Sequence, residues 1–241
     1  MNKTLLLCAS LLMGLNLAPA LAETYSIVLN KYALAVVDDV TVYQHMVRHD
    51  PKKEMVDLAT AIPGIRLEIV YATDKHFVKK KMYTQPKAYL RKVAAQALTK
   101  VQAELKTKGL SLKIWDAYRP FAVTEMMWEL IRDDRYVADP SHGSKHNRGC
   151  AVDLTIVDAK TGKELKMPTP YLDFTAKAHH ATTSFSKEVL ANRALLRKTM
   201  EKHGFLAYNE EWWHYNFAEW GNYELMDISF EQLQGLEAPG S

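Results

Sequence analysis

The sequence predicts an α+β fold in which helices flank a small, largely antiparallel sheet. The first reason is that short strand-like segments, at residues 111–118, 150–157 and 212–217, are interleaved with separated helical segments. The second reason is that proline or glycine bounds the helical segments, and these residues mark where helices begin and end. Short strands interleaved with separated helices are typical of this fold class.

Three segments have helical patterns. Residues 86–108 begin with Pro86 and end before Gly109, and apolar residues recur at every fourth position, namely Tyr89, Val93, Ala97, Val101 and Leu105. This spacing predicts a helix with one buried face. Residues 120–132 begin with another proline and residues 186–203 end before Gly204, so both segments are also predicted helices.

The first 22 residues have the pattern of a secretory signal peptide. Lys3 precedes an almost wholly apolar run over residues 4–17, and residues 20–22 (Ala-Leu-Ala) provide the small side chains of a cleavage site. The apolar run is shorter than the roughly 20 residues that a membrane anchor needs. We therefore expect cleavage between Ala22 and Glu23, export of the chain, and no membrane anchor.

The remaining chain has the size and composition of one globular domain with an N-terminal extension. Subtracting 22 residues from 241 leaves 219, and 48% of the whole sequence is hydrophobic. Residues 23–60 mix strand-like and charged pieces, and the sequence assigns them no role. Cleavage removes Lys3 and no acid, so the formal charge falls from +3 to +2, which excludes an electrostatic footprint for nucleic acid. Cys150 is the only cysteine left, so no intramolecular disulfide can form.

An acidic residue interrupts the apolar strand predicted at residues 150–157. Asp153 lies among core residues that alternate along that strand, namely Val152, Leu154 and Ile156. The alternation directs Asp153 to the opposite face of the sheet. Because an unpaired carboxylate is costly to bury, a partner has to compensate its charge.

A turn before this strand brings a histidine close to the carboxylate. Gly149 lets the backbone turn, and His146 then comes back beside Asp153. An imidazole and a carboxylate that converge in this way are suitable ligands for zinc. The alternative interpretation is that Asp153 pairs with a structural arginine or lysine and that His146 lies in a surface loop.

A second histidine follows in residues 210–215 (Glu-Glu-Trp-Trp-His-Tyr). On a strand, His214 shares a face with Asn216, so it can serve as a third zinc ligand. Glu211 lies three positions earlier, and we expect it in the loop that leads into the strand, from where it can lean toward the metal. A catalytic zinc needs three protein ligands, an open position and a nearby carboxylate base. The alternative is an aromatic edge strand with a satisfied histidine.

An arginine stands at the end of a third motif, residues 115–120 (Trp-Asp-Ala-Tyr-Arg-Pro). The proline that follows disfavours the helical conformation at Arg119 and keeps it extended at the strand end. A guanidinium at the rim of the sheet can bind a developing oxyanion or a substrate carboxylate. The alternative is a structural ion pair, and Asp116 is interpreted as a structural partner within its strand.

Together, these motifs resemble the zinc D-Ala-D-Ala metallopeptidases, and more closely the D-alanyl-D-alanine dipeptidases of the VanX type. The resemblance rests first on Ser-x-His-x-x-Gly-x-Ala-x-Asp at residues 144–153 and on Glu-x-x-His at residues 211–214. The aromatic residues in the motifs at residues 115–120 and 210–215 make it more specific. It spans about residues 62–218. The resemblance implies one zinc ion per chain, held by His146, Asp153 and His214 in a cleft at the sheet, and residues 61–241 as the catalytic zinc peptidase domain.

The resemblance also implies a role for four further residues. Glu211 is the catalytic base and Arg119 stabilises the transition state, while Ser144 and Asp173 help to hold the dipeptide. Asp173 suits the free α-ammonium of such a substrate. One departure is His76, which stands where the family pattern leads us to expect asparagine.

The function that the resemblance implies is hydrolysis of the D-Ala-D-Ala dipeptide to two D-alanines. An exported enzyme does not meet the cytoplasmic pool of this dipeptide, so we expect a role in cell-wall peptide turnover, in the periplasm. Two alternatives remain open. One is a zinc D,D-carboxypeptidase that acts on longer peptidoglycan peptides, and the other is a non-catalytic zinc module that binds wall peptides.

Overall fold

A computed structural model describes residues 27–134 and 136–237, so the predicted signal peptide lies outside the described residues. Its largest sheet has five strands, and one neighbouring pair, β3 with β5, is parallel while the others are antiparallel. The order across this sheet is β3 (Arg66–Leu67), β5 (Leu110–Asp116), β6 (Ala151–Asp158), β8 (His214–Phe217) and β7 (Phe205–Ala207). The predicted α+β fold with a largely antiparallel sheet is therefore confirmed.

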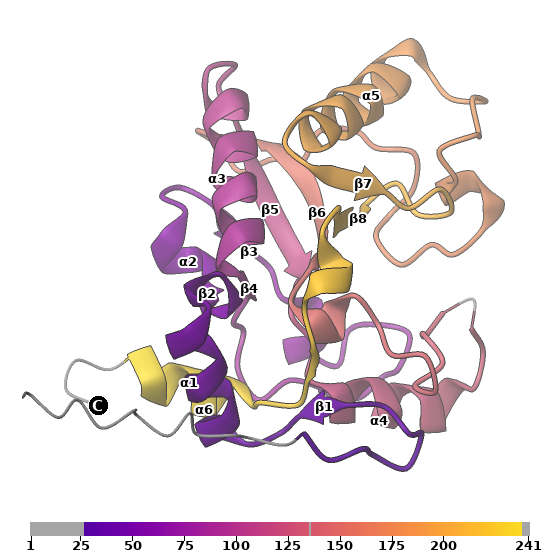
Figure 1. Ribbon diagram of the computed structural model, residues 1–241. Helices are drawn as coiled ribbons and strands as arrows, with labels where there is room; N and C mark the ends of the chain where they lie inside the picture. Colours follow the sequence, from indigo (N-terminus) through magenta and orange to yellow (C-terminus); the bar gives the residue numbers. More distant parts are fainter. Residues whose placement is uncertain (1–26, 135, 238–241) are drawn as a thin grey trace, which may run out of the picture.

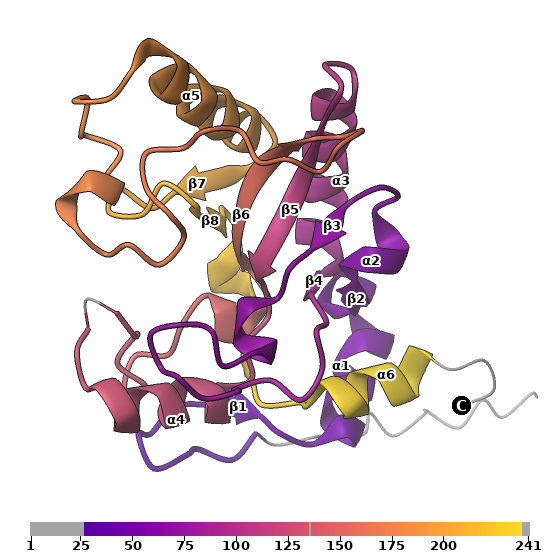
Figure 2. The ribbon, with the colours of Figure 1, turned by 180° about the vertical axis from the view of Figure 1, so that it is seen from behind.

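Two long helices cover one face of this sheet. α3 (Lys92–Lys106) packs on β5 and contacts α5 (Lys187–Lys202), which packs on β6 and β7. Ser186 caps α5, since its hydroxyl accepts a hydrogen bond from the backbone N–H of Val189 at 3.3 Å. In Figure 2, α3 lies behind β5, and the long connection from β6 to α5 runs in front of the sheet. The other face therefore carries loops, and Asp153 lies on it.

The helix predicted at residues 86–108 is confirmed from Lys92 onward and is wrong before that residue. Tyr89–Arg91 form a strand, β4, which pairs antiparallel with β2 (Met55–Asp57). All three residues of β4 are buried. Pairing with a strand that is distant in sequence outweighs the helical spacing of Tyr89, because tertiary context overrides a weak local preference.

A second layer lies below the sheet in the view of Figure 1. It contains α1 (Val40–His49), α4 (Phe121–Ile131), α6 (Phe230–Glu237) and the parallel pair β1 (Val36–Val37) and β9 (Leu225–Met226). The short elements are α2 (Leu58–Ala61) and the 3₁₀ turns η1 (Pro51–Lys53), η2 (Val70–Ala72), η3 (His146–Arg148), η4 (Ala176–Ala178) and η5 (Trp220–Asn222). Of the helices in the described part of the chain, none has both the length and the apolar character that crossing a bilayer requires.

Residues 27–60, to which the sequence assigned no role, contribute to the same core as the rest of the chain. β1 pairs with β9 and β2 pairs with β4, so both strands depend on partners that come later in the sequence. Tyr43 and Met46 on α1 are buried in the main hydrophobic cluster. This part of the chain is therefore packed against the domain that follows it.

One buried guanidinium connects three distant segments of the chain. Arg91 is fully buried, and it donates hydrogen bonds to the carbonyl oxygens of Lys53 (2.6 Å), Arg148 (3.0 Å) and Glu224 (3.2 Å). A charged donor that satisfies several buried carbonyls stabilises each of them. Since Arg148 belongs to η3, Arg91 also fixes the loop that carries His146.

We predict that Arg91→Met lowers the free energy of unfolding by about 3 kcal/mol or more, because it leaves three partly buried carbonyls without this donor, at about 1–3 kcal/mol each. Urea denaturation of the variant and the parent protein measures the difference. The matched control is Arg66→Met, which removes an exposed arginine with one hydrogen bond, to the carbonyl of Ala159. Equal losses in the two variants would contradict the role assigned to Arg91.

Candidate metal centre

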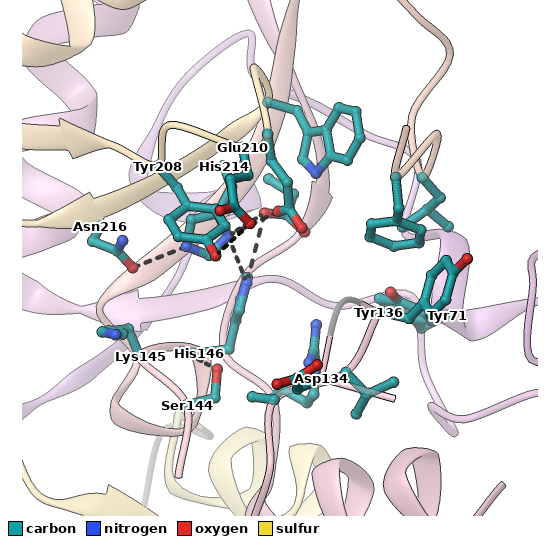
Figure 3. A pocket seen from close by; sticks show the side chains of 18 of the residues that line it. Tyr71, Asp134, Tyr136, Ser144, Lys145, His146, Tyr208, Glu210, His214 and Asn216 are labelled. Carbon is teal, nitrogen blue, oxygen red and sulfur yellow. Dashed lines mark hydrogen bonds and ion pairs between the residues drawn. The ribbon is translucent and has the colours of Figure 1, made fainter. Parts of the chain in front are cut away.

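Three side chains converge on one point near the starts of β6 and β8, as Figure 3 shows for the two histidines. His146 comes from η3, Asp153 from β6 and His214 from β8, and their nearest ligand atoms all lie within 4.8 Å of one another. His214 Nδ1 is 2.9 Å from Asp153 Oδ1 and 3.3 Å from His146 Nε2. His146 Nε2 is 3.6 Å from Asp153 Oδ1.

Strand register and one glycine produce this convergence. Asp153 lies directly opposite His214 across the antiparallel pair β6 and β8, so the two side chains emerge on the same face. Gly149 has φ +65°, a left-handed conformation that returns the chain toward β6. A Cβ atom there would lie 2.7 Å from Met55 Cε, so a larger residue would also be crowded. The predicted turn at Gly149 is confirmed.

The three ligand atoms fit a zinc ion. Zinc bonds of about 2.0–2.1 Å in a tetrahedral arrangement require ligand atoms about 3.3 Å apart. The separations of 2.9, 3.3 and 3.6 Å between the three atoms lie on both sides of that value. Two imidazoles and one carboxylate are also a donor set that zinc accepts.

The remaining ring nitrogens of both histidines have other partners, which orients the rings. His146 Nδ1 lies 2.6 Å from the carbonyl oxygen of Ala117. His214 Nε2 lies 2.9 Å from Oδ1 of Asn216. Such partners fix the tautomer and leave the opposite nitrogen of each ring available to a metal.

Glu211 lies in the loop directly before β8, as its odd spacing from His214 predicted. Its Oε2 is 3.8 Å from His214 Nδ1. Burial raises the pKa of Glu211 to about 7, with the neighbouring Asp153 carboxylate adding to the shift and His214 and Arg119 opposing it. A carboxyl group with a pKa near neutrality is suited to accept and return a proton.

Asp153 is buried, with 4% of its surface exposed, and its carboxylate lies between the two histidines. Burial raises its pKa, but the charges and hydrogen bonds of His146 and His214 outweigh burial and hold the pKa well below its usual range. The carboxylate is therefore compensated by the two histidines, and the alternative of a pairing with arginine or lysine is wrong.

Arg119 forms an ion pair and also lines the cavity above the three ligands. Its Nη2 lies 2.6 Å from Asp116 Oδ2, and its guanidinium lies 5.3 Å from the centre of the Tyr71 ring. Asp116 is fully buried and also accepts hydrogen bonds from the Tyr83 hydroxyl at 2.6 Å and from the backbone of Ala117 at 3.0 Å. Among the described residues, Nε of Arg119 has no hydrogen-bond partner. The structural ion pair of Arg119 is therefore confirmed, and binding of an oxyanion or a substrate carboxylate by its guanidinium stays a prediction.

The cavity has a volume of about 620 Å³ and contains the candidate metal ligands, Glu211 and Arg119 in its lining. One part of the wall is aromatic, with Tyr71, Tyr136, Phe174 and Trp213. Another part is polar and carries Ser144, Lys145, Tyr208, Glu210 and Asn216 (Figure 3). Its size lies within the range of about 300–1,000 Å³ for small-molecule sites.

The structure brings one of the two predicted substrate-binding residues into the cavity. Ser144 lines it, and its Oγ accepts a hydrogen bond from the backbone of His146 at 3.2 Å. Asp173 is not among the lining residues, although its neighbours Leu172 and Phe174 are. The Asp173 carboxylate instead accepts a hydrogen bond from the backbone N–H of Thr175 at 3.0 Å.

Two residues without a predicted role in the site contact its candidate residues: Asp116 pairs with Arg119, and Asn216 contacts His214. Asp116 was interpreted as a structural partner, and its ion pair with Arg119 agrees with that interpretation. The sequence signal that links it to the site is its position three residues before Arg119. Asn216 lies two residues after His214, so strand alternation already placed it on the same face. His76 is buried, but it is not among the residues that line the cavity.

Comparisons with known proteins show the family to which the chain belongs. A profile of the M15 peptidase family, described as D-Ala-D-Ala dipeptidase, matches residues 51–232. The D-alanyl-D-alanine dipeptidase of Escherichia coli (strain K12) is 35% identical over 177 residues, which cover 73% of this chain and 91% of that protein. The protein of the same name in Enterococcus faecalis is 29% identical over 179 residues, 65% of this chain and 87% of that protein. The solved structure of the LdcB LD-carboxypeptidase has 20% identity and a TM-score of 0.40, covering 76% of this chain and 77% of that one.

We predict that Asp116→Ala lowers the free energy of unfolding by about 3–5 kcal/mol, because it leaves the buried Arg119 guanidinium without its counter-ion. Thermal or urea unfolding measures the loss. The control is Asp74→Ala, which removes an exposed carboxylate. If Asp116→Ala were as stable as the control, the ion pair would not be needed to hold Arg119 in place.

Proposed function

Because the chain belongs to the D-Ala-D-Ala dipeptidase family of peptidases, we propose that it hydrolyses D-alanyl-D-alanine to two D-alanines with one zinc ion held by His146, Asp153 and His214. The observation that supports this most strongly is that the three ligand atoms, Glu211 and Arg119 share one cavity. When bound, zinc lowers the pKa of a water molecule and polarises the scissile carbonyl.

Glu211 handles the proton in this proposal. Its carboxylate takes a proton from the attacking water and returns it to the nitrogen of the leaving alanine. The raised pKa of about 7 allows both steps near neutral pH. The position of Glu211 in a loop, 3.8 Å from His214 and outside the ligand set, keeps it available as a base.

Arg119 stabilises the negative charge that develops on the carbonyl oxygen. Asp116 accepts a hydrogen bond from Nη2, while Nε has no partner among the described residues. A donor that is already oriented before the reaction contributes about 2.7–4 kcal/mol to the stability of the transition state. Because Asp116 already holds Arg119 in position, no free energy is needed to reorient the guanidinium during the reaction.

Ser144 and Asp173 are the proposed substrate contacts. The Ser144 hydroxyl lines the cavity beside His146 and offers a polar group to the dipeptide backbone. Asp173 is proposed to bind the α-ammonium, and it has to leave its hydrogen bond with Thr175 to do so. The exposure of that bond makes its loss inexpensive.

The second candidate is a D,D-carboxypeptidase for longer wall peptides, and two observations favour it. The cavity, at about 620 Å³, is larger than two alanines require, and Asp173 does not line it. The names and the nearly full-length match of the dipeptidase relatives favour the dipeptide. A non-catalytic zinc module would have no need of Glu211 or of a positioned Arg119.

The predicted signal peptide supports a location outside the cytoplasm. We therefore propose that the enzyme acts in the periplasm, in the turnover of wall peptides.

We predict that Glu211→Gln lowers kcat for D-Ala-D-Ala by about 10²–10⁴-fold, because the amide cannot accept the proton. Zinc content, measured by metal analysis, stays at the parent level since Glu211 is not a ligand. A chelator abolishes activity of the parent enzyme, and added zinc restores it. Full hydrolysis by Glu211→Gln would contradict the mechanism, as would activity that survives chelation.

We also predict that acylation of the substrate amino group lowers kcat/KM by about 10-fold to 100-fold, which corresponds to a charged hydrogen bond of about 1.5–3 kcal/mol. Asp173→Asn lowers kcat/KM for the free dipeptide by a similar factor and leaves the acylated dipeptide unaffected. Steady-state assays with both substrates measure these values. Equal hydrolysis of free and acylated dipeptides would favour the carboxypeptidase.

A further inference from the structure

The two oxygens of Asp153 have different surroundings. Oδ1 faces the two histidines, at 2.9 Å from His214 Nδ1 and 3.6 Å from His146 Nε2. Oδ2 accepts a hydrogen bond from the hydroxyl of Tyr171 at 2.8 Å. The carboxylate is therefore held with one oxygen toward the candidate metal position and the other toward Tyr171.

Aromatic packing fixes the ring that carries this hydroxyl. The Tyr171 ring stacks on Trp115 of β5, with ring centres 4.5 Å apart and an angle of 13° between the planes. Its other contact is edge-on with Trp213, which directly precedes His214, at 5.5 Å and 86°. Trp115 and Trp213 are both buried, so they form a well-packed surface against which the Tyr171 ring lies. With the ring held by these two contacts, its hydroxyl faces Oδ2 of Asp153.

The backbone beside Tyr171 is strained, which agrees with a functional constraint. Leu172 has φ +66°, in the left-handed region that costs a residue other than glycine about 1–2 kcal/mol. The Leu172 side chain lines the cavity, while Tyr171 packs against the two tryptophans. Strain of this kind persists where the surrounding packing determines the conformation, and such places are frequently functional.

We propose that Tyr171 is a positioning residue of the metal site, which holds Oδ2 of Asp153 so that the carboxylate binds the ion through Oδ1 alone. This inference rests on the proposed function, because it requires that the site binds zinc. A carboxylate held in this way supplies one ligand atom, and together with two histidines it leaves the fourth zinc position open. If both oxygens turned to the ion, they would crowd the position that the reaction needs.

The test is Tyr171→Phe, which keeps the stacked ring and removes only the hydroxyl. Zinc affinity is measured by competition with a chelator at constant pH, and we expect the variant to bind zinc about 10-fold to 100-fold more weakly. The matched control is Tyr43→Phe in α1, which also removes a buried hydroxyl. That hydroxyl accepts a hydrogen bond from the backbone N–H of Met55 at 2.7 Å, and Tyr43 does not line the cavity. The control should bind zinc as the parent does. Circular dichroism of both variants checks that they fold.

A second readout reports the coordination directly. With cobalt in place of zinc, the visible absorption bands depend on the number and geometry of the ligand atoms. We expect Tyr171→Phe to change these bands, because Oδ2 of Asp153 is released to approach the ion, and Tyr43→Phe to leave them as in the parent. A purely structural role of Tyr171 would not alter them.

The outcomes separate the two claims. A parent protein that binds zinc, with Tyr171→Phe binding equally tightly and giving the parent cobalt spectrum, would overturn the inference and leave the proposed function intact. A parent protein that binds no zinc would overturn the proposed function and the inference with it. Weaker binding together with a changed spectrum in Tyr171→Phe alone supports the inference.

Discussion

The buried carboxylate of Asp153, on the central strand β6, is the constraint on which the rest of the site depends. Only 4% of its surface is exposed, and a charge so placed is tolerated only with partners. Strand register places His214 directly opposite Asp153, and the turn at Gly149 brings His146 beside it. The Tyr171 hydroxyl donates a hydrogen bond to the other carboxylate oxygen, Oδ2. Two imidazole nitrogens and one carboxylate oxygen therefore turn toward the same point, which is the candidate metal position.

Two buried arginines connect this centre to the loops around it. Arg91 holds the carbonyl of Arg148, so the 3₁₀ turn η3 with His146 stays attached to β4 and to segments from both ends of the described chain. Arg119 is held by Asp116, which lies opposite Asp153 in the neighbouring strand. The register between β5, β6 and β8 therefore places Asp116, Asp153 and His214 side by side, while the η3 turn brings in the third candidate ligand, His146.

The parts of the site that depend on local pattern could be predicted from the sequence. Alternation isolated Asp153 and His214 from their core neighbours, and Gly149 marked the turn, because both features act within a few residues. The pairing of β2 with β4 could not be predicted, since it joins segments whose local patterns do not indicate each other. The hydrogen bond of Tyr171 with Asp153 and the orientation of Asp173 likewise depend on how the β6–α5 connection folds over the sheet.

The most direct measurement of the central claim is anomalous X-ray scattering at the zinc edge from crystals grown with zinc. The account predicts one strong peak per chain, about 2.0–2.2 Å from His146 Nε2, Asp153 Oδ1 and His214 Nδ1. A peak at a different position, or density without a peak between these three atoms, would contradict it.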